Sequence, residues 1–132
     1  MARVLIVEDN PANMTLAKFL LESAGHTVLS ATDAEAGLTL ARDEQPNLIL
    51  MDIQLPGMDG LEATALLKHD RATHGIPVIA LTALAMKGDE ERIRAAGCDG
   101  YIAKPLAYRE FLAVISEHLA AAPRQRDERV IR

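Results

Sequence analysis

The sequence predicts an α/β fold, a doubly wound five-stranded parallel sheet with five helices. Five short apolar runs recur at regular intervals along the 132 residues. A segment with helical spacing of apolar residues follows each run. Three of the runs are uninterrupted, which is typical of parallel strands that helices cover on both faces.

The strands are expected at the apolar runs, which are Val4–Val7, Thr27–Leu29, Leu48–Met51, Val78–Leu81 and Tyr101–Ala103. The helices are expected between and after them, at residues 11–24, 33–42, 61–69, 87–96 and 108–122. The alternation of strand and helix repeats five times, and parallel strands joined by helices are the arrangement that it favours.

Local signals mark several helix ends. Asn10 is a good cap for the first helix, Pro11 suits its first position, and Gly25 is expected to end it. Thr32 and Glu35 have the spacing of a capping box, so we expect Thr32 to cap the second helix.

The chain is expected to form one domain over residues 1–121, followed by a charged, flexible tail at residues 122–132 that Pro123 separates from the last helix. The net charge of −5 argues against direct binding of nucleic acid. A single cysteine and the absence of a membrane-length apolar run indicate a cytoplasmic protein without membrane insertion.

Polar residues stand where four of the predicted strands end. Glu8 and Asp9 follow the first strand, Asp52 the third, Thr82 the fourth and Lys104 the fifth. Because sites in open α/β sheets form at the carboxyl ends of the strands, these side chains are expected to converge. Each of them has an ordinary structural explanation alone, as a cap or a surface residue, but their joint placement is hard to explain that way.

Three carboxylates held together repel one another unless a cation joins them. Oxygen-only ligands favour Mg²⁺, with Mn²⁺ possible, and such an ion usually takes phosphate oxygens as well. The pattern therefore indicates phosphoryl transfer with Asp52 as the nucleophile. Lys104 would supply a positive charge, and Thr82 a hydroxyl donor, to the phosphoryl oxygens.

These segments resemble the signatures of response-regulator receiver domains, the CheY-like, flavodoxin-like superfamily. The resemblance rests on Val4–Asn10, Leu48–Gly60, Leu81–Ala83 and Ile102–Pro105, and it extends over about residues 3–120. The segment Ala85–Arg92 further resembles single-domain regulators of bacterial cell fate. Receivers attached to hybrid histidine kinases or larger regulators carry similar segments and remain an alternative.

The resemblance implies roles for individual residues. Asp52 is the phosphorylation site, and the backbone carbonyl of Gln54 joins Glu8, Asp9 and Asp52 as a metal ligand. Thr82 and Tyr101 are the switch residues, although Tyr101 also has an interpretation as plain strand packing. The bond between Lys104 and Pro105 is implied to be cis.

The resemblance also implies two partner proteins. A histidine kinase or histidine phosphotransfer protein would donate the phosphoryl group at the first helix, and a downstream protein would bind the face of the fourth helix, fifth strand and fifth helix. The candidate contact residues are Asn13, Met14 and Ala17 for the donor, and Leu84, Ala85, Met86, Lys87, Tyr101 and Tyr108 for the downstream protein.

Three other functions fit parts of the pattern. A magnesium-dependent aspartyl-phosphate phosphatase needs a second aspartate two residues after the nucleophile, and Gln54 occupies that position. An FMN binder would place phosphate beside Glu8 and Asp9, which repel it. A receiver that is never phosphorylated need not retain every site residue. We therefore expect a stoichiometric phospho-acceptor that assists its own phosphorylation and dephosphorylation, not a turnover enzyme.

Overall fold

The computed structural model describes the backbone of residues 2–83 and 87–131, and the side chains of residues 2–83 and 88–120. Its five strands form one parallel sheet in the order β2-β1-β3-β4-β5. The strands are β1 (Arg3–Val7), β2 (Thr27–Ala31), β3 (Leu48–Asp52), β4 (Val78–Thr82) and β5 (Gly100–Ala103). All five predicted strands are confirmed, each within two residues at either end.

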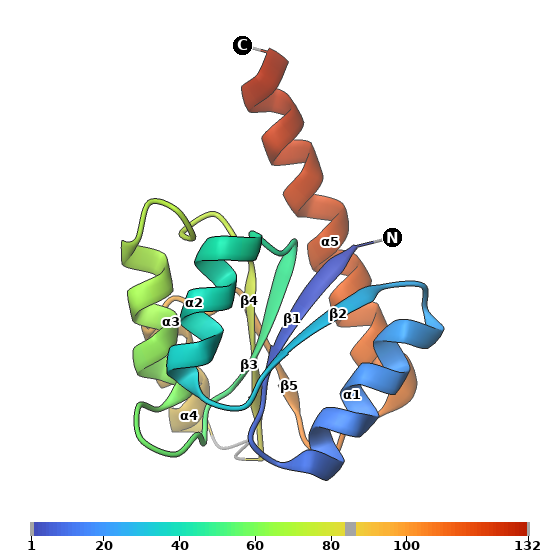
Figure 1. Ribbon diagram of the computed structural model, residues 1–132, viewed down its shortest axis with the longest axis vertical. Coiled ribbons are helices and arrows are strands. Elements are labelled where there is room, and N and C mark those ends of the chain that lie inside the picture. The colour runs from blue at the N-terminus through green and yellow to red at the C-terminus, as the bar shows by residue number, and fades with distance from the viewer. Residues whose placement is uncertain (1, 84–86, 132) are drawn as a thin grey trace.

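Helices cover both faces of this sheet, as Figure 1 shows. They are α1 (Pro11–Ser23), α2 (Ala34–Glu44), α3 (Gly60–His69), α4 (Lys87–Ala95) and α5 (Tyr108–Ile131). Helices α1 and α5 pack on one face, around Leu21, Leu50 and Phe111. Helices α2 and α3 pack on the other face around Met51 and Leu67, and α4 adds a smaller cluster on that side.

The first helix begins and ends where the sequence predicts. The side chain of Asn10 accepts a hydrogen bond from the backbone amide of Asn13 at 3.0 Å. Pro11 occupies the first turn, where its missing N–H costs nothing. Gly25 has a φ of +92°, a conformation that glycine adopts without strain.

The predicted start of the second helix is wrong by one residue. Asp33, and not Thr32, is the cap of α2, and its carboxylate accepts from the amide of Ala36 at 2.8 Å. Asp and Thr both favour this position, with Asp ranked somewhat higher. The helix then continues to Glu44, two residues past the predicted end.

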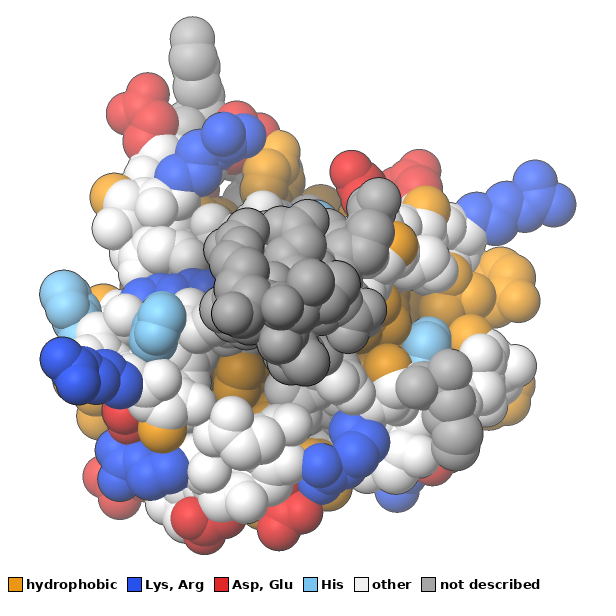
Figure 2. Space-filling view, turned by 90° about the horizontal axis from the view of Figure 1, so that it is seen from above, with side chains coloured by type: hydrophobic (Ala, Val, Ile, Leu, Met, Phe, Trp, Pro, Cys, Tyr) orange, Lys and Arg blue, Asp and Glu red, His pale blue; other side chains and the backbone are white. Residues whose placement is uncertain are grey.

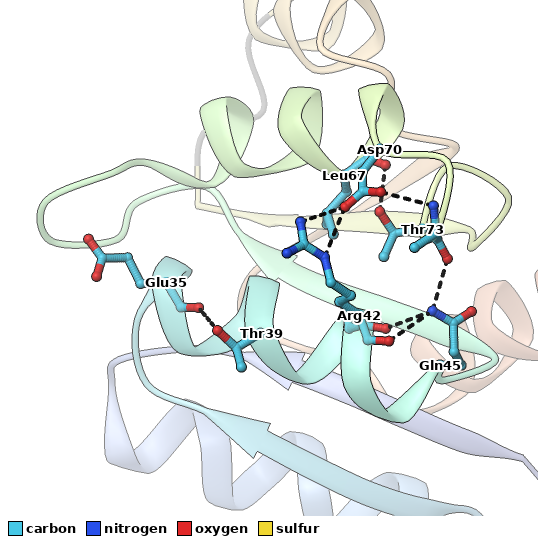
Figure 3. Close-up of polar contacts among 9 residues, drawn as sticks. Glu35, Thr39, Arg42, Gln45, Leu67, Asp70 and Thr73 are labelled. Carbon is cyan, nitrogen blue, oxygen red and sulfur yellow. Dashed lines mark hydrogen bonds and ion pairs between the residues drawn. The ribbon is translucent and has the colours of Figure 1, made fainter.

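A polar junction fixes α2 against the end of α3 (Figure 3). The guanidinium of Arg42 lies 2.7 Å from a carboxylate oxygen of Asp70, and the Thr73 hydroxyl donates to the carbonyl of Leu67 at 2.7 Å. Gln45 leaves α2 with a φ of +48° and donates from its side chain to the carbonyl of Ala72 at 2.9 Å. These contacts hold α3, whose other end approaches the candidate site.

The predicted end of the last helix is also wrong. Helix α5 continues through Pro123 to Ile131, whereas the sequence predicted an end at Ala122. Its last turns project beyond the sheet, at the end of the molecule where β1 begins (Figure 1). Proline removes one backbone donor from a helix, but Arg, Gln and Glu, which follow it here, favour helix.

The end of the molecule where the strands begin carries mixed charge. Figure 2 views this end, and acidic, basic and histidine side chains are interspersed on its visible described surface. The candidate site lies at the opposite end of the strands. Within the part of the chain that the structure describes, no helix combines the length and hydropathy that crossing a membrane requires.

Candidate functional site

The site lies at the carboxyl ends of the central strands. In the order β2-β1-β3-β4-β5 the chain reverses direction along the sheet between β1 and β3, and ligands bind at such a switch point in open α/β sheets. Glu8 follows β1, Asp52 is the last residue of β3, and Val7 pairs with Met51 in register. The fold therefore sets the two carboxylates side by side.

Lys104 joins both carboxylates. Its Nζ lies 2.8 Å from Oε1 of Glu8 and 3.3 Å from Oδ2 of Asp52. The lysine arrives from the end of β5, where its backbone amide donates to the carbonyl of Thr82 at 2.8 Å. Glu8 and Asp52 are only 1% and 2% exposed, so the ammonium is needed to offset the burial of their charge.

Local backbone contacts orient the same carboxylates. The amide of Asn10 donates to Oε2 of Glu8 at 3.1 Å, and the amide of Gln54 donates to Oδ1 of Asp52 at 2.9 Å. Each bond closes a tight turn directly after the carboxylate that it holds. These turns keep both side chains at the rim of the sheet.

The loop between β3 and α3 packs closely on Asp52. A Cβ atom at Gly60 would lie 2.1 Å from the backbone oxygen of Asp52, so only glycine fits there. Gly57 has a φ of +74°, a conformation that glycine adopts without strain. The glycine at position 60 therefore lets the start of α3 approach the strand end that carries Asp52.

The two buried carboxyl groups titrate differently. Burial and the neighbouring Glu8 raise the pKa of Asp52 to about 6. Burial also acts to raise the pKa of Glu8, but hydrogen bonds with Asp52, Lys104 and Asn10 outweigh it and hold that pKa below its ordinary value. Burial disfavours the charged form of Lys104, yet the two carboxylates raise its pKa above the usual range.

The acidic cluster has the composition of a site for a hard cation. One carboxylate oxygen from each of Glu8, Asp9 and Asp52 lies within 4.8 Å of the others. Oε1 of Glu8 is buried, and the partner that the structure gives it in the described part of the chain is the ammonium of Lys104 at 2.8 Å. Three acids face one ammonium, so negative charge is in excess, and an oxygen-ligated divalent ion fits that donor set.

The two predicted switch residues lie on neighbouring strands. Thr82 ends β4 and is 1% exposed, and Tyr101 lies on β5 opposite Ala80. The Tyr101 hydroxyl donates a hydrogen bond to the carboxylate of Glu90 on α4. Sequence reasoning did not single out Glu90, because one acid among the run at 89–91 carries no distinguishing signal.

The predicted donor surface needs one correction. Ala17 is 1% exposed and belongs to the core beneath α1, so its assignment to a docking surface is wrong. Asn13 and Met14 are half-buried at the start of the same helix. Leu16 and Phe19, which the sequence analysis missed, are 39% and 65% exposed and line a shallow groove on α1.

The predicted output surface is described only in part. Tyr108 is 56% exposed at the start of α5. Lys87 begins α4, but its side chain lies outside the described residues, as do Leu84, Ala85 and Met86 altogether. The peptide bond between Lys104 and Pro105 is cis, as the resemblance implied.

Comparison with known proteins agrees with this fold. Residues 4–116 match the response regulator receiver domain family, and the chain belongs to it. Such a domain works with a kinase or phosphotransfer protein and a downstream partner. Among curated proteins, the polar-differentiation response regulators DivK of Brucella ovis and Brucella abortus are 50% identical to it over 119 residues, which cover 90% of this chain and 97% of theirs.

Solved structures give the same result. A CheY-like receiver domain protein from Methanospirillum hungatei superposes with a TM-score of 0.86 at 34% identity, covering 95% of this chain and 98% of that one. The receiver domain of a Pseudomonas aeruginosa sensor histidine kinase, solved with a magnesium ion in its active-site cleft, gives 0.85 at 34% identity, covering 91% and 98%. The predicted fold class is confirmed.

Proposed function

We propose that this receiver accepts a phosphoryl group on Asp52 from a phosphohistidine donor, with Mg²⁺ bound, and then changes conformation to alter its affinity for a downstream protein. The observation that supports this most strongly is the placement of Asp52. It is a buried carboxylate at the switch point of the sheet, beside a second acid and in contact with Lys104.

The chemistry is a phosphoryl transfer between two side chains. An oxygen of Asp52 forms a bond to phosphorus as the bond between phosphorus and the histidine nitrogen breaks, and the departing imidazole keeps the electron pair and takes up a proton. With a pKa of about 6, Asp52 is mostly ionised at neutral pH and can attack. Lys104, already 3.3 Å from Asp52, lies within reach of a phosphoryl oxygen.

Glu8, Asp9 and Asp52 would hold the metal, with the backbone carbonyl of Gln54 as a further ligand. When bound, Mg²⁺ supplies positive charge that lets an anionic carboxylate and an anionic phosphoryl group approach each other. The oxygen-only donor set fits Mg²⁺ best, and Mn²⁺ fits the same set. Lys104 remains to neutralise Glu8, with which it makes its shorter contact.

The phosphorylated form is expected to persist as a signal. A hydrolase of this geometry uses a second acid two residues after the nucleophile, and the amide of Gln54 cannot act as a general acid or base there. Hydrolysis then depends on a water positioned in the site. The protein is thus a stoichiometric acceptor that assists both its own phosphorylation and its own dephosphorylation.

The relatives suggest the pathway. Because the chain matches DivK over 97% of that protein's length, we place it in a cytoplasmic phosphorelay that controls polar differentiation and the cell cycle. Its phosphodonor is a histidine kinase or a histidine phosphotransfer protein, docking near Asn13 and Met14. The downstream protein binds the α4-β5-α5 face.

The conformational change begins at Thr82. A phosphoryl oxygen on Asp52 attracts the Thr82 hydroxyl, and the space that Thr82 leaves admits the ring of Tyr101. Since Tyr101 packs near Ile93 of α4, its rotation changes the surface to which the downstream protein binds.

Phosphotransfer with and without the metal tests this proposal. A histidine kinase labelled with radioactive phosphate should transfer the label to the receiver in Mg²⁺, and EDTA should stop the transfer. Asp9→Ala should weaken Mg²⁺ binding and slow transfer together. Asp43→Ala is the matched control, because Asp43 is an exposed acid on α2. Transfer at an unchanged rate without any divalent ion would contradict the metal assignment.

A further inference from the structure

Tyr101 bridges β5 and α4 in a way that the switch proposal does not use. Its ring is half-buried and packs on a small cluster that contains Ala80 and Ile93. Its hydroxyl donates to the carboxylate of Glu90. Glu90 and Ile93 lie three residues apart on α4 and therefore share one face of that helix, so one residue binds the hydroxyl while the other packs on the ring.

The contact is specific to Glu90 among the acids of α4. Asp89 pairs instead with Arg92 at 3.1 Å, and Glu91 is exposed. Hydrogen bonds to an ionised acceptor are stronger than neutral ones. The Glu90 hydrogen bond, followed by burial, raises the pKa of Tyr101, while Arg94 opposes this shift, in agreement with a phenol that donates to a carboxylate.

We propose that Glu90 is a positioning residue which holds the Tyr101 hydroxyl against α4 in the unphosphorylated protein, and that activation requires this hydrogen bond to break. The inference rests on the proposed function, because it assigns the resting position of the switch that phosphorylation of Asp52 moves. Glu90 thereby sets how much of the unphosphorylated protein is already in the active conformation.

The geometry explains why such a contact would oppose activation. Thr82 pairs with Ala103 in register, and Ala80 with Tyr101, so Tyr101 lies two positions before the level of Thr82 along the strands. To fill space beside Thr82, the ring has to turn toward the carboxyl end of the sheet. A hydroxyl held by a side chain of α4 cannot make that turn without leaving its acceptor.

Beryllofluoride binding tests the proposal without an identified partner. This anion mimics a phosphoryl group on an aspartate, and in Mg²⁺ it should bind the parent protein but not Asp52→Asn. A ligand that prefers the active state binds more tightly when that state is already more populated. Glu90→Ala should therefore tighten beryllofluoride binding by about five-fold.

Two comparisons separate this effect from simple loss of negative charge. Glu91→Ala removes the same charge one residue away and should leave the affinity unchanged. Tyr101→Phe should tighten binding as Glu90→Ala does, and adding Glu90→Ala to it should give no further gain, because the hydrogen bond is already absent.

Four other outcomes would contradict the proposal. If Glu91→Ala tightens binding as much as Glu90→Ala, or if the Glu90→Ala and Tyr101→Phe gains add, the positioning role of Glu90 is overturned. Equal affinity in Glu90→Ala and the parent overturns it as well, while leaving the proposed function intact. Failure of beryllofluoride to bind the parent overturns the proposed function and this inference together.

Discussion

Asp52 and Glu8 lie in one acidic cluster, but their environments shift the pKa values of the two carboxyl groups in opposite directions. Glu8 takes the shorter contact with Lys104, and its pKa is lowered; Asp52 takes the longer one, and burial beside Glu8 raises its pKa to about 6. The group with the raised pKa is Asp52, the proposed nucleophile. A carboxylate held less firmly by its cation is the freer of the two to attack phosphorus.

The raised pKa makes the metal-free fold sensitive to pH. Folded Asp52 keeps its proton up to about pH 6, whereas the unfolded chain releases it near 3.8. Between these values the folded state binds more protons, so this group's contribution to stability falls as pH rises. Asp52→Asn should therefore raise the free energy of unfolding at pH 7 by about 1–2 kcal/mol, and the gain should disappear below about pH 4.

Urea unfolding at several pH values, with EDTA present, measures this difference. Asp43→Asn is the control, because it removes an exposed acid and should show no such gain. A gain of the same size at pH 4 and pH 7 would contradict the explanation from charge burial.

For single residues, α1 shows what can and cannot be predicted from the sequence. The strand-end residues could be predicted because apolar runs mark where each strand stops. The docking residues could not, because Met14, Ala17 and Leu20 share helical spacing and only the packed structure separates core from surface. Leu16 and Phe19 lie outside that stripe and are exposed. The role of Glu90 could be recognised only from the structure, because it depends on the position of Tyr101.

At the scale of elements, the ends of helices were harder to predict than their positions. Thr32 and Asp33 are adjacent residues that can both cap a helix, and the capping-box spacing favoured the wrong one. Proline at 123 was taken as a stop, yet α5 continues to Ile131. Both errors concern energies of about 1–3 kcal/mol, which packing or neighbouring residues can outweigh.

The position of Asp52, the proposed nucleophile, depends on how closely the start of α3 packs against it. Gly60→Ala would place a methyl group 2.1 Å from the backbone oxygen of Asp52. Backbone cannot move aside as a flexible side chain can, so we expect a loss of about 2–3 kcal/mol in the free energy of unfolding. Phosphorylation should slow as well, because the clash displaces the strand end.

Thermal or urea unfolding measures the loss, and Gly75→Ala is the matched control. Gly75 has open space around its Cβ position and does not have a positive φ. Gly75→Ala should be neutral or slightly stabilising, because it restricts only the unfolded chain. Comparable destabilisation by both substitutions would mean that the clash with Asp52 is not the cause.

At the scale of the whole molecule, the proposed activation needs a signal to pass from β3 to β5. Thr82 ends the strand between them, and a hydrogen bond from its hydroxyl to a charged phosphoryl group contributes on the order of 1.5–3 kcal/mol. That would raise a resting active population of about 1% to between roughly 10% and 60%. The proposed switch would therefore be a shift of populations between two conformations.

Thr82→Ala tests this link. It should still bind beryllofluoride in Mg²⁺ at Asp52, although more weakly, while the NMR resonances of the Tyr101 ring stay near their resting positions at saturation. In the parent and in Thr39→Ala, which alters an exposed threonine of α2, the same resonances should move. Equal movement in Thr82→Ala would leave ordering of the loop around Asp52 as the better explanation.

The central claim is that Asp52 is the phospho-acceptor, and mapping the phosphorylated residue tests it most directly. The parent protein, phosphorylated by a histidine kinase in Mg²⁺, should carry an acid-stable, hydroxylamine-sensitive phosphoryl group that peptide mass spectrometry places on Asp52. Asp52→Asn should show no such group, while Asp43→Asn should be labelled like the parent. Full labelling of Asp52→Asn, with the phosphoryl group mapped to another residue, would contradict the account.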